Sequence, residues 1–456
     1  MVKAKKKESL TPEERLQAAL VPESEQPYPV PGNWCWVSLQ TIDQYRASST
    51  DPSKYPDTLF ELYSVPSSAD NYPEIVSGCE IGSTKQSVQR GDILLCKINP
   101  RINRVWKVSQ YTENALLASS EWIIIRNSKI VSDYLMYCFR APYFREYMLS
   151  NVSGVGGSLM RAQPKYVKTY PVPVPPLPEQ QRIVDRIESL FAKLDEAKQK
   201  AQDALDSFET RKAAILHKAF IGELTAQWRK EHGVGMESWS SCKLIDILVE
   251  KPRNGYSPKP VDYVTACKSM TLSATTTGVF KPEFFKYIDE EIPEDSHLWL
   301  TPGDILIQRA NSLEKVGMSA IYTGAEYEFI YPDLMMKLTI KEPNNKHYID
   351  YYLKTNEILN YFRSNATGTA GNMPKINQKV VSETPLILPE TQEQAEIVRI
   401  LDDLLAKEQQ AKEAAEGVLE QIDLMKKAIL ARAFRGELGT NDPREESAVE
   451  LLKQGL

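Results

Sequence analysis

Residues 170–193 read YPVPVPPLPEQQRIVDRIESLFAK, and residues 384–407 read TPLILPETQEQAEIVRILDDLLAK. Further along, KAAILHKAFIGEL over 212–224 is answered by KKAILARAFRGEL over 426–438. The paired stretches align without a gap and at one constant spacing. The chain therefore contains an internal repeat, which indicates that one structural unit occurs twice.

The repeat extends towards the N-terminus in a weaker form. The tetrapeptide GDIL occurs at 91–94 and again at 303–306, and Trp34 corresponds to Trp239. Between these anchors the two copies differ almost completely. A common frame therefore carries two different inserts, and the short strands and helices indicated in each insert predict a mixed α/β domain.

Each copy ends in a long amphipathic helix. Its apolar residues step alternately by four and three, which is the pattern of a coiled-coil seam. The predicted seam residues are Ile183, Ile187, Leu190, Ile397, Leu401, Leu404 and Ile422, with Val418 and Met425 continuing the pattern. Glu408 interrupts the second seam, so that position has either an imperfect pairing or a partner.

These signals predict the organisation of the whole chain. We expect a terminal segment with a short helix over 1–25, a variable domain over 26–176, a helix over 177–222, a linker over 223–235, a second variable domain over 236–389, a helix over 390–436 and a terminal segment over 437–456. Helix-start residues at 11–14 and 442–445 leave two alternatives, since the terminal helices can pack together or remain loose.

Composition limits the function classes. The 456 residues contain 55 Lys and Arg against 61 Asp and Glu, so any basic surface for nucleic acid must be local. The six cysteines lie far apart without a zinc-ligand spacing, which predicts reduced thiols and no metal site. No apolar run is long enough to cross a bilayer, so we expect a cytoplasmic protein without a membrane partner.

The motifs of catalysis are missing from the sequence. It contains no G-x-x-x-x-G-K-[ST] motif for ATP and no Gly-rich turn with the Asn/Asp-Pro-Pro motif of an adenine methyltransferase. The carboxylate of Asp333 beside Lys337 only faintly suggests a nuclease. We therefore expect no catalytic residue, no metal and no cofactor in this chain.

Polar and basic residues gather at corresponding places of the two inserts, after each GDIL strand. Arg and Lys neutralise phosphate or bind guanine, and Asn pairs with adenine, so these loops suit DNA. The tracts before the long helices add further cations and amides. The candidate DNA-binding residues are Lys97, Asn99, Arg101, Asn103, Arg104, Arg161 and Lys165 in the first insert, and Arg253, Asn254, Tyr256, Lys259, Gln308, Arg309, Asn311, Ser312, Lys315, Lys375 and Asn377 in the second.

The combination of repeated EQ and IV helices ending in AF-x-GEL, the ELTAQWR tail over 223–229 and the GDIL-bearing variable domains resembles the specificity subunit of type I restriction-modification systems. The resemblance covers residues 34–438. It implies an α+β fold class, with two globular mixed α/β target recognition domains related by a pseudo-twofold repeat and separated by two long helices packed as an antiparallel coiled coil.

The resemblance also implies a function. Each target recognition domain reads one half of a bipartite, asymmetric site in double-stranded DNA, and the subunit directs adenine methylation and restriction by its partners. Those partners are two methyltransferase subunits, which use S-adenosylmethionine, and motor-nuclease subunits, which use ATP and Mg²⁺. Two other interpretations of the sequence remain open: a coiled-coil scaffold for protein interaction that does not read DNA, and an autonomous endonuclease.

Overall fold

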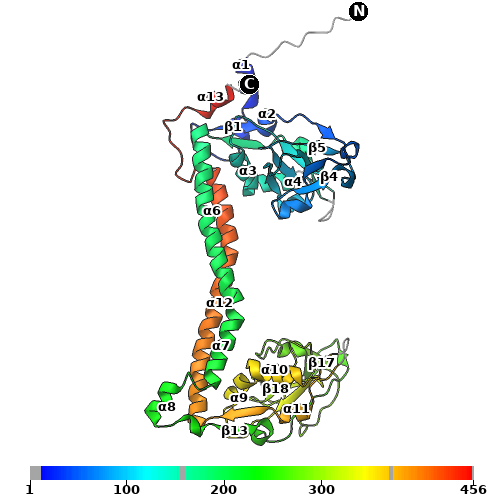
Figure 1. Cartoon of the computed structure of the whole chain (residues 1–456), viewed down its shortest axis with the longest axis vertical. Coiled ribbons are helices and arrows are strands. Elements are labelled where there is room, and N and C mark those ends of the chain that lie inside the picture. The colour runs from blue at the N-terminus through cyan, green and yellow to red at the C-terminus, as the bar shows by residue number, and fades with distance from the viewer. Residues whose placement is uncertain (1–11, 151, 155–159, 369–372, 454–456) are drawn as a thin grey trace, which may run out of the picture. The chain divides into compact units, whose positions relative to one another are not determined.

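The computed structural model describes residues 12–150, 152–154, 160–368 and 373–453, and Figure 1 shows its elements. The chain forms two compact units. Unit 1 comprises Met1–Ala201 and Gly417–Leu456, and unit 2 comprises Gln202–Glu416. The boundary between them falls within the long helices, so each unit contains one variable domain and part of each helical segment.

Unit 1 is a mixed α/β domain built on three principal sheets. Strand β1 (Cys35–Ser38) pairs antiparallel with β12 (Pro171–Val174), which directly precedes the first long helix. The other sheets have the orders β7-β6-β9 (Val105–Lys107, Ile93–Cys96, Trp122–Ile125) and β2-β5-β8-β3-β4 (Ser49–Thr50, Lys85–Ser87, Ala115–Ala118, Leu59–Tyr63, Glu74–Ser77). The minor elements are α2 (Leu39–Ile42), α3 (Ser132–Arg140), α4 (Pro142–Ser150), α5 (Pro164–Val167), β10 (Val152–Ser153) and β11 (Arg161–Ala162).

Unit 2 repeats this frame around a different insert. Strand β13 (Ser240–Lys243) pairs with β22 (Pro385–Leu388), as β1 pairs with β12. Its sheets have the orders β14-β21-β18-β19 (Arg253–Asn254, Met335–Leu338, Ile305–Gln308, Ser319–Ile321) and β15-β17-β16-β20 (Pro260–Val261, Phe285–Ile288, Cys267–Met270, Phe329–Ile330). Its helices are α8 (Ala226–His232), α9 (Lys346–Leu353), α10 (Asn356–Ser364) and α11 (Gln378–Ser382).

The first long helix is interrupted, which differs from the single helix predicted over 177–222. Helix α6 (Leu177–Asp206) ends before Ser207, and α7 (Phe208–Phe220) begins after it. The Ser207 hydroxyl donates to the Asp203 carbonyl at 2.8 Å, and such bonds compete with the helical backbone ladder. The second helix, α12 (Thr391–Ala433), is continuous, and α8 lies in the segment predicted to be a linker.

Within unit 1, α6 packs against the C-terminal part of α12. Ile183 and Ile187 share a buried core with Leu430 and Phe434. Further along α6, Asp195 pairs with Lys426 at 2.5 Å. Residue numbers rise along α6 as they fall along α12, so the two segments run antiparallel.

Unit 2 contains a second antiparallel contact of the same kind. Leu216 shares a buried core with Ile397 and Leu401, and Arg211 pairs with Glu408 at 2.8 Å. The Glu408 that interrupts the predicted seam therefore has a charged partner. It pairs with an arginine from the facing helix.

The predicted seam is correct only in part. Its residues Ile183, Ile187, Ile397, Leu401 and Ile422 are buried, whereas Leu190 and Leu404 are half-buried. The extension to Val418 and Met425 is wrong, because these side chains are 40% and 47% exposed. A straight helix has 3.6 residues per turn and drifts away from a strict seven-residue repeat, so an extrapolated seam rotates out of the interface.

The two terminal helices pack together in unit 1, which confirms one of the two alternatives for them. Helices α1 (Pro12–Ala19) and α13 (Ala448–Lys453) lie beside one another (Figure 1), and the Ala448 N–H donates to the Asn33 carbonyl at 2.9 Å. The helix start predicted at 442–445 is wrong. Asp442 instead accepts from the Arg444 N–H in a turn, and the helix begins at Ala448.

Among the described residues, none of the helices combines the length and the apolar character that a membrane crossing requires.

Candidate nucleic-acid interface

A buried Glu-Gln pair joins each variable domain to its long helix. The Gln180 side chain accepts from the Val131 N–H at 2.9 Å, and Gln394 accepts from the Asn345 N–H at the same distance. Each amide nitrogen then donates to a proline carbonyl, of Pro175 in one unit and of residue 389 in the other, at 3.0 Å. The pairs therefore set the start of α3 against α6 and the start of α9 against α12.

The glutamates of these pairs hold the tryptophans that directly precede β1 and β13. Glu179 accepts from the Trp34 indole at 2.8 Å, and Glu393 accepts from the Trp239 indole at 2.9 Å. Both glutamates are fully buried. The repeated EQ motif is thus part of the frame that presents the variable domains.

The GDIL motifs form turns that lead into buried strands. Gly91 and Gly303 have φ angles of +91° and +95°, which favour glycine. Asp92 accepts from Arg126 at 2.7 and 2.8 Å, and Asp304 accepts from the Thr339 hydroxyl at 2.8 Å. These aspartates are buried and bonded within the fold, so their role is to fix the strands β6 and β18.

The structure brings the predicted loop residues together with the tracts before the long helices. Ile98 forms an antiparallel bridge with Arg161 in unit 1, and Ala310 forms the same bridge with Lys375 in unit 2. In each unit, the loop after the GDIL strand and the tract before the long helix therefore lie side by side. Part of the Gly-rich tracts, residues 155–159 and 369–372, lies outside the described residues.

In unit 1, several predicted residues have partners within the fold. The Asn103 side chain donates to the Phe139 carbonyl at 2.9 Å and so anchors the loop between β6 and β7. Arg161 pairs with Glu121 at 2.7 Å, and the Lys165 ammonium lies 4.6 Å from the centre of the Tyr166 ring. Lys97 and Asn99 are half-buried, whereas Arg101 is exposed.

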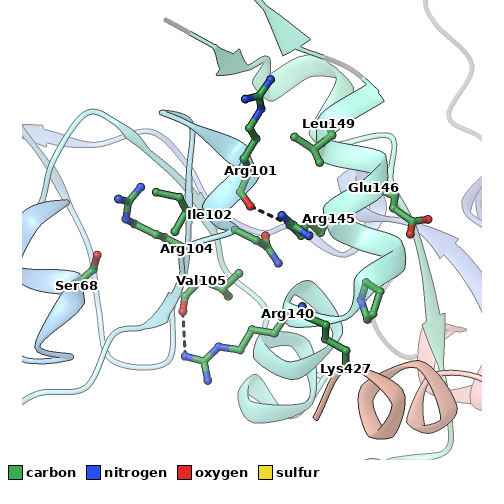
Figure 2. A pocket seen from close by; sticks show the side chains of 12 residues that line it. Ser68, Arg101, Ile102, Arg104, Val105, Arg140, Arg145, Glu146, Leu149 and Lys427 are labelled. Carbon is green, nitrogen blue, oxygen red and sulfur yellow. Dashed lines mark hydrogen bonds between the residues drawn. The ribbon is translucent and has the colours of Figure 1, made fainter. Parts of the chain in front are cut away.

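A cavity of about 550 Å³ lies beside this loop, and we call it the basic pocket (Figure 2). Its cations are Arg101 and Arg104 from the loop, Arg140 from α3, Arg145 from α4 and Lys427 from α12. Its carboxylate is that of Glu146, and its remaining lining residues are Ser68, Ile102, Asn103, Val105, Pro142 and Leu149. The pocket therefore concentrates positive charge in a chain whose overall charge is negative.

Two of the pocket arginines are held by backbone carbonyls. Arg145 donates to the Arg101 carbonyl at 2.8 Å, and Arg140 donates to the Val105 carbonyl at 3.0 Å (Figure 2). Among the described residues, none of the five cations forms an ion pair. Burial in the pocket walls lowers the pKa of Arg140, which means that its charge is desolvated there.

Sequence reasoning found Arg101 and Arg104 but missed the other cations of the pocket. Arg140, Arg145 and Lys427 belong to helices that are distant in sequence from the loop. Each looks like an ordinary solvated helix residue when the sequence is considered alone. The repeat could have drawn attention to these positions, because they have different residues in the second copy although the surrounding frame is the same.

In unit 2, Gln308 has a different role from the predicted one. Its side chain is fully buried and donates to the Leu272 carbonyl and the Thr275 hydroxyl, both at 2.9 Å. Its oxygen accepts from the Asn311 amide at 2.6 Å. Since a buried and fully bonded amide cannot reach DNA, Gln308 positions Asn311 instead.

The remaining predicted residues of the unit 2 loop stay close to its surface. Arg309 donates to the Asp333 carbonyl at 3.1 Å and is half-buried, as is Lys315. Ser312 and Lys375 are exposed. These side chains remain candidates for contact with a partner.

Some of the other predicted residues of unit 2 form bonds within the fold, and others are exposed at its surface. Asn377 accepts from the Val380 N–H at 2.9 Å and caps α11, and Asn254 lies in β14. Arg253 pairs with Glu250 at 2.7 Å, and the exposed Tyr256 donates to Glu290 at 3.1 Å. Lys259 is exposed.

Two hollows lie near these residues in unit 2. One, of about 310 Å³, is lined by Ser257, Ser269, Thr271, Ser273 and Lys286 among others. The other, of about 580 Å³, includes Thr367, Met373 and Lys375. Leu334 lines both, so they are neighbours. The first hollow is rich in hydroxyl groups, and each of the two has one lysine, whereas the basic pocket is rich in arginine.

The sequence matches the family described as "Type I restriction modification DNA specificity domain" over residues 73–205 and 257–417. The specificity subunit of the type I restriction enzyme EcoKI from Escherichia coli is 26% identical over 321 residues, which cover 69% of this chain and 68% of that protein. The StySPI specificity subunit from Salmonella potsdam is 25% identical over 329 residues, covering 69% and 67%.

Solved structures have the same fold. The HsdS subunit from Thermoanaerobacter tengcongensis superposes with a TM-score of 0.63 at 19% identity and covers 91% of this chain and 100% of its own. A chain from a study of complex assembly and conformational transition of the type I restriction-modification system gives a TM-score of 0.70 at 20% identity, covering 90% and 100%.

Proposed function

Because the chain belongs to the type I restriction-modification DNA specificity family, we propose that it reads a bipartite, asymmetric site in double-stranded DNA, one half with each unit. Specificity subunits of type I systems are generally non-catalytic. The chemistry would therefore belong to the partner subunits, with this chain choosing where they act.

One observation carries the proposal. The bridges Ile98–Arg161 and Ala310–Lys375 place polar loops at the same position of two matching frames, and the loops have different residues. Two readers of one identical sequence would need the same side chains, whereas two readers of different half-sites need different ones. A scaffold that only bound protein would have no need for two basic, divergent loops on a repeated frame.

We propose that α6, α7 and α12 form an antiparallel coiled coil that serves as the spacer between the two readers. The antiparallel contacts within each unit support this role. Two methyltransferase subunits and the motor-nuclease subunits would assemble with this chain, and S-adenosylmethionine, ATP and Mg²⁺ would be bound by those partners. Adenine methylation and restriction would follow at the site that this chain selects.

The test is footprinting of the chain assembled with its methyltransferase subunits. We expect two protected segments separated by an unprotected gap. Replacing Arg101 and Arg104 by Ala should weaken protection of one segment, and replacing Arg309 and Lys375 by Ala should weaken protection of the other. A single continuous footprint, or no sequence preference at all, would contradict the proposal and favour a protein-interaction scaffold. Metal-dependent cleavage by the isolated chain would favour the endonuclease.

A further inference from the structure

The internal repeat allows the basic pocket to be compared with its counterpart in the same chain. Shared hydrogen bonds establish which positions correspond. Tyr134 donates to the Pro173 carbonyl as Tyr348 donates to the Ile387 carbonyl, and the Gln180 and Gln394 side chains accept from matching N–H groups. The Cys96 N–H donates to the Arg104 carbonyl as the Gln308 N–H donates to the Met318 carbonyl.

By this correspondence, four of the pocket cations have no free counterpart in unit 2. Arg104 is matched by Met318, Arg145 by Leu359 and Lys427 by Ala213. Leu359 is buried, so the place of one arginine is filled by core packing. The second copy therefore has no charge at these three positions. Its loop retains one arginine contact of this kind, because Arg363 donates to the Glu314 carbonyl at 3.1 Å.

The fourth position retains a cation, but that cation is neutralised. Arg140 is matched by Lys354, which forms an ion pair with Asp350 and donates to the Gly278 carbonyl at 2.6 Å. Asp350 also accepts from the buried Ser319 hydroxyl at 2.8 Å. Lys354 thus closes a polar cluster inside unit 2, whereas Arg140 lies on the wall of a cavity and forms no ion pair with the described residues.

We propose that the basic pocket of unit 1 is a clamp for the phosphodiester backbone of DNA, and that the two units therefore hold DNA unequally. The inference rests on the proposed function. It assigns most of the electrostatic attraction between this chain and the DNA phosphates to unit 1. Guanidinium groups match phosphate oxygens with paired hydrogen bonds, and a desolvated arginine gains most from an anion. Apart from Asn103, which is bonded to the Phe139 carbonyl, the pocket is lined by cations, apolar side chains and single hydroxyl and carboxyl groups. That lining fits a backbone anion better than a base edge.

Lys427 connects the basic pocket to the long helix α12. Lys427 belongs to α12, whereas the arginines come from the variable domain of the same unit. A phosphate held in the pocket would touch the long helix and the recognition loop together. DNA backbone bound there would thus fix the register of the duplex against the helix, independently of base sequence.

The experiment measures DNA affinity against salt concentration for the chain assembled with its methyltransferase subunits. Each lost phosphate contact lowers the slope of log K against log salt by about 0.9. The variant Arg104→Gln/Arg145→Gln/Lys427→Gln should therefore lower it by about 2 to 3. The matched control Arg46→Gln/Lys54→Gln/Lys129→Gln removes the same charge from exposed cations of unit 1 outside the pocket, and its slope should match the wild type. Arg145→Lys should retain most of the slope.

A second arm uses DNA in which single phosphates are replaced by neutral methylphosphonates. Neutral linkages beside the half-site of unit 1 should weaken binding more than those beside the other half-site. An unchanged slope in the pocket variant, or equal sensitivity of both half-sites, would overturn the clamp. Loss of methyltransferase assembly with an unchanged slope would show that the pocket binds an acidic protein surface instead. Absence of any bipartite footprint in the wild type would refute the proposed function itself, and the two failures are thus distinguishable.

Discussion

Glu393 and Glu179 occupy the same position in the two copies, but only Glu393 faces a buried cation. Glu393 accepts from Arg229 at 2.6 Å, from the Thr225 hydroxyl at 2.7 Å and from the Trp239 indole. The Arg229 side chain is only 10% exposed. Replacing Glu393 by Gln keeps the shape of the side chain but leaves the arginine without its counter-charge.

The expected cost follows from this burial. Removing one partner of a buried ion pair destabilises a protein by about 3 to 5 kcal/mol, because the remaining charge is neither solvated nor paired. Glu179 accepts from the neutral donors Trp34 and Asn441, both at 2.8 Å. Glu179→Gln weakens those bonds but leaves no buried cation without a counter-charge. It should therefore lower the free energy of unfolding by about 1 kcal/mol.

The assay is urea unfolding of both variants, with hydrogen exchange used to assign each transition to its unit. With an m-value of about 2 to 3 kcal/mol per molar, Glu393→Gln should move the unit 2 midpoint down by about 1 to 2.5 M. The double variant Glu393→Gln/Arg229→Met should be more stable than Glu393→Gln, because it no longer buries the unpaired charge of Arg229. Equal losses in Glu393→Gln and Glu179→Gln, or no recovery in the double variant, would refute this reasoning.

Three further predictions concern the core, the thiols and the second recognition loop. Ile187→Asp should lower the free energy of unfolding by on the order of 3 kcal/mol in urea titration, whereas Leu424→Asp, at a side chain 63% exposed, should change it by less than about 0.5 kcal/mol; similar losses would contradict the helix packing. Iodoacetamide at pH 8 should alkylate the exposed Cys79 and spare Cys35, since burial raises the pKa of that thiol to about 12, and peptide mass mapping would detect the contrary result. Gln308→Leu should cost about 1 to 3 kcal/mol in unfolding and weaken one half of the footprint, and an intact footprint would exclude its positioning role.

The frame could be predicted from the sequence because its signals are local or periodic. The apolar spacing around Ile183 and Ile397 and the repeated GDIL turns need no knowledge of tertiary contacts. The break at Ser207 could not be predicted in the same way, since another serine, Ser189, lies within α6 without interrupting it. Only the bond of Ser207 to a preceding carbonyl marks the interruption. The exposure of Met425 depends on how far the seam drifts, which the pattern alone does not determine.

The candidate site was predictable only where its residues are neighbours in sequence. The loop containing Arg101 and Arg104 stands out as a basic stretch, but Arg140 and Lys427 reach the same pocket only after the chain has folded. Gln308 illustrates the opposite error. A polar residue at the end of a strand looks like a surface contact in the sequence. In the structure, however, the Gln308 side chain donates to partners in the segment 272–276 and is buried.

The internal repeat separates the residues of the frame from those of the readers. Where a position has the same partner in both copies, as Gln180 and Gln394 do, the two units need the same structure and the residue belongs to the frame. Where the surrounding fold is the same but the charge differs, as for Arg104 against the half-buried Met318, structure alone gives no reason for the difference. Such positions point to a requirement outside the chain. A polyanion that contacts the two units differently would explain why the cations of the basic pocket are replaced or neutralised at the matching positions of unit 2. The variant Met318→Arg/Ala213→Lys, which leaves the buried Leu359 in place, should therefore raise affinity for DNA in a binding titration without changing the bases selected.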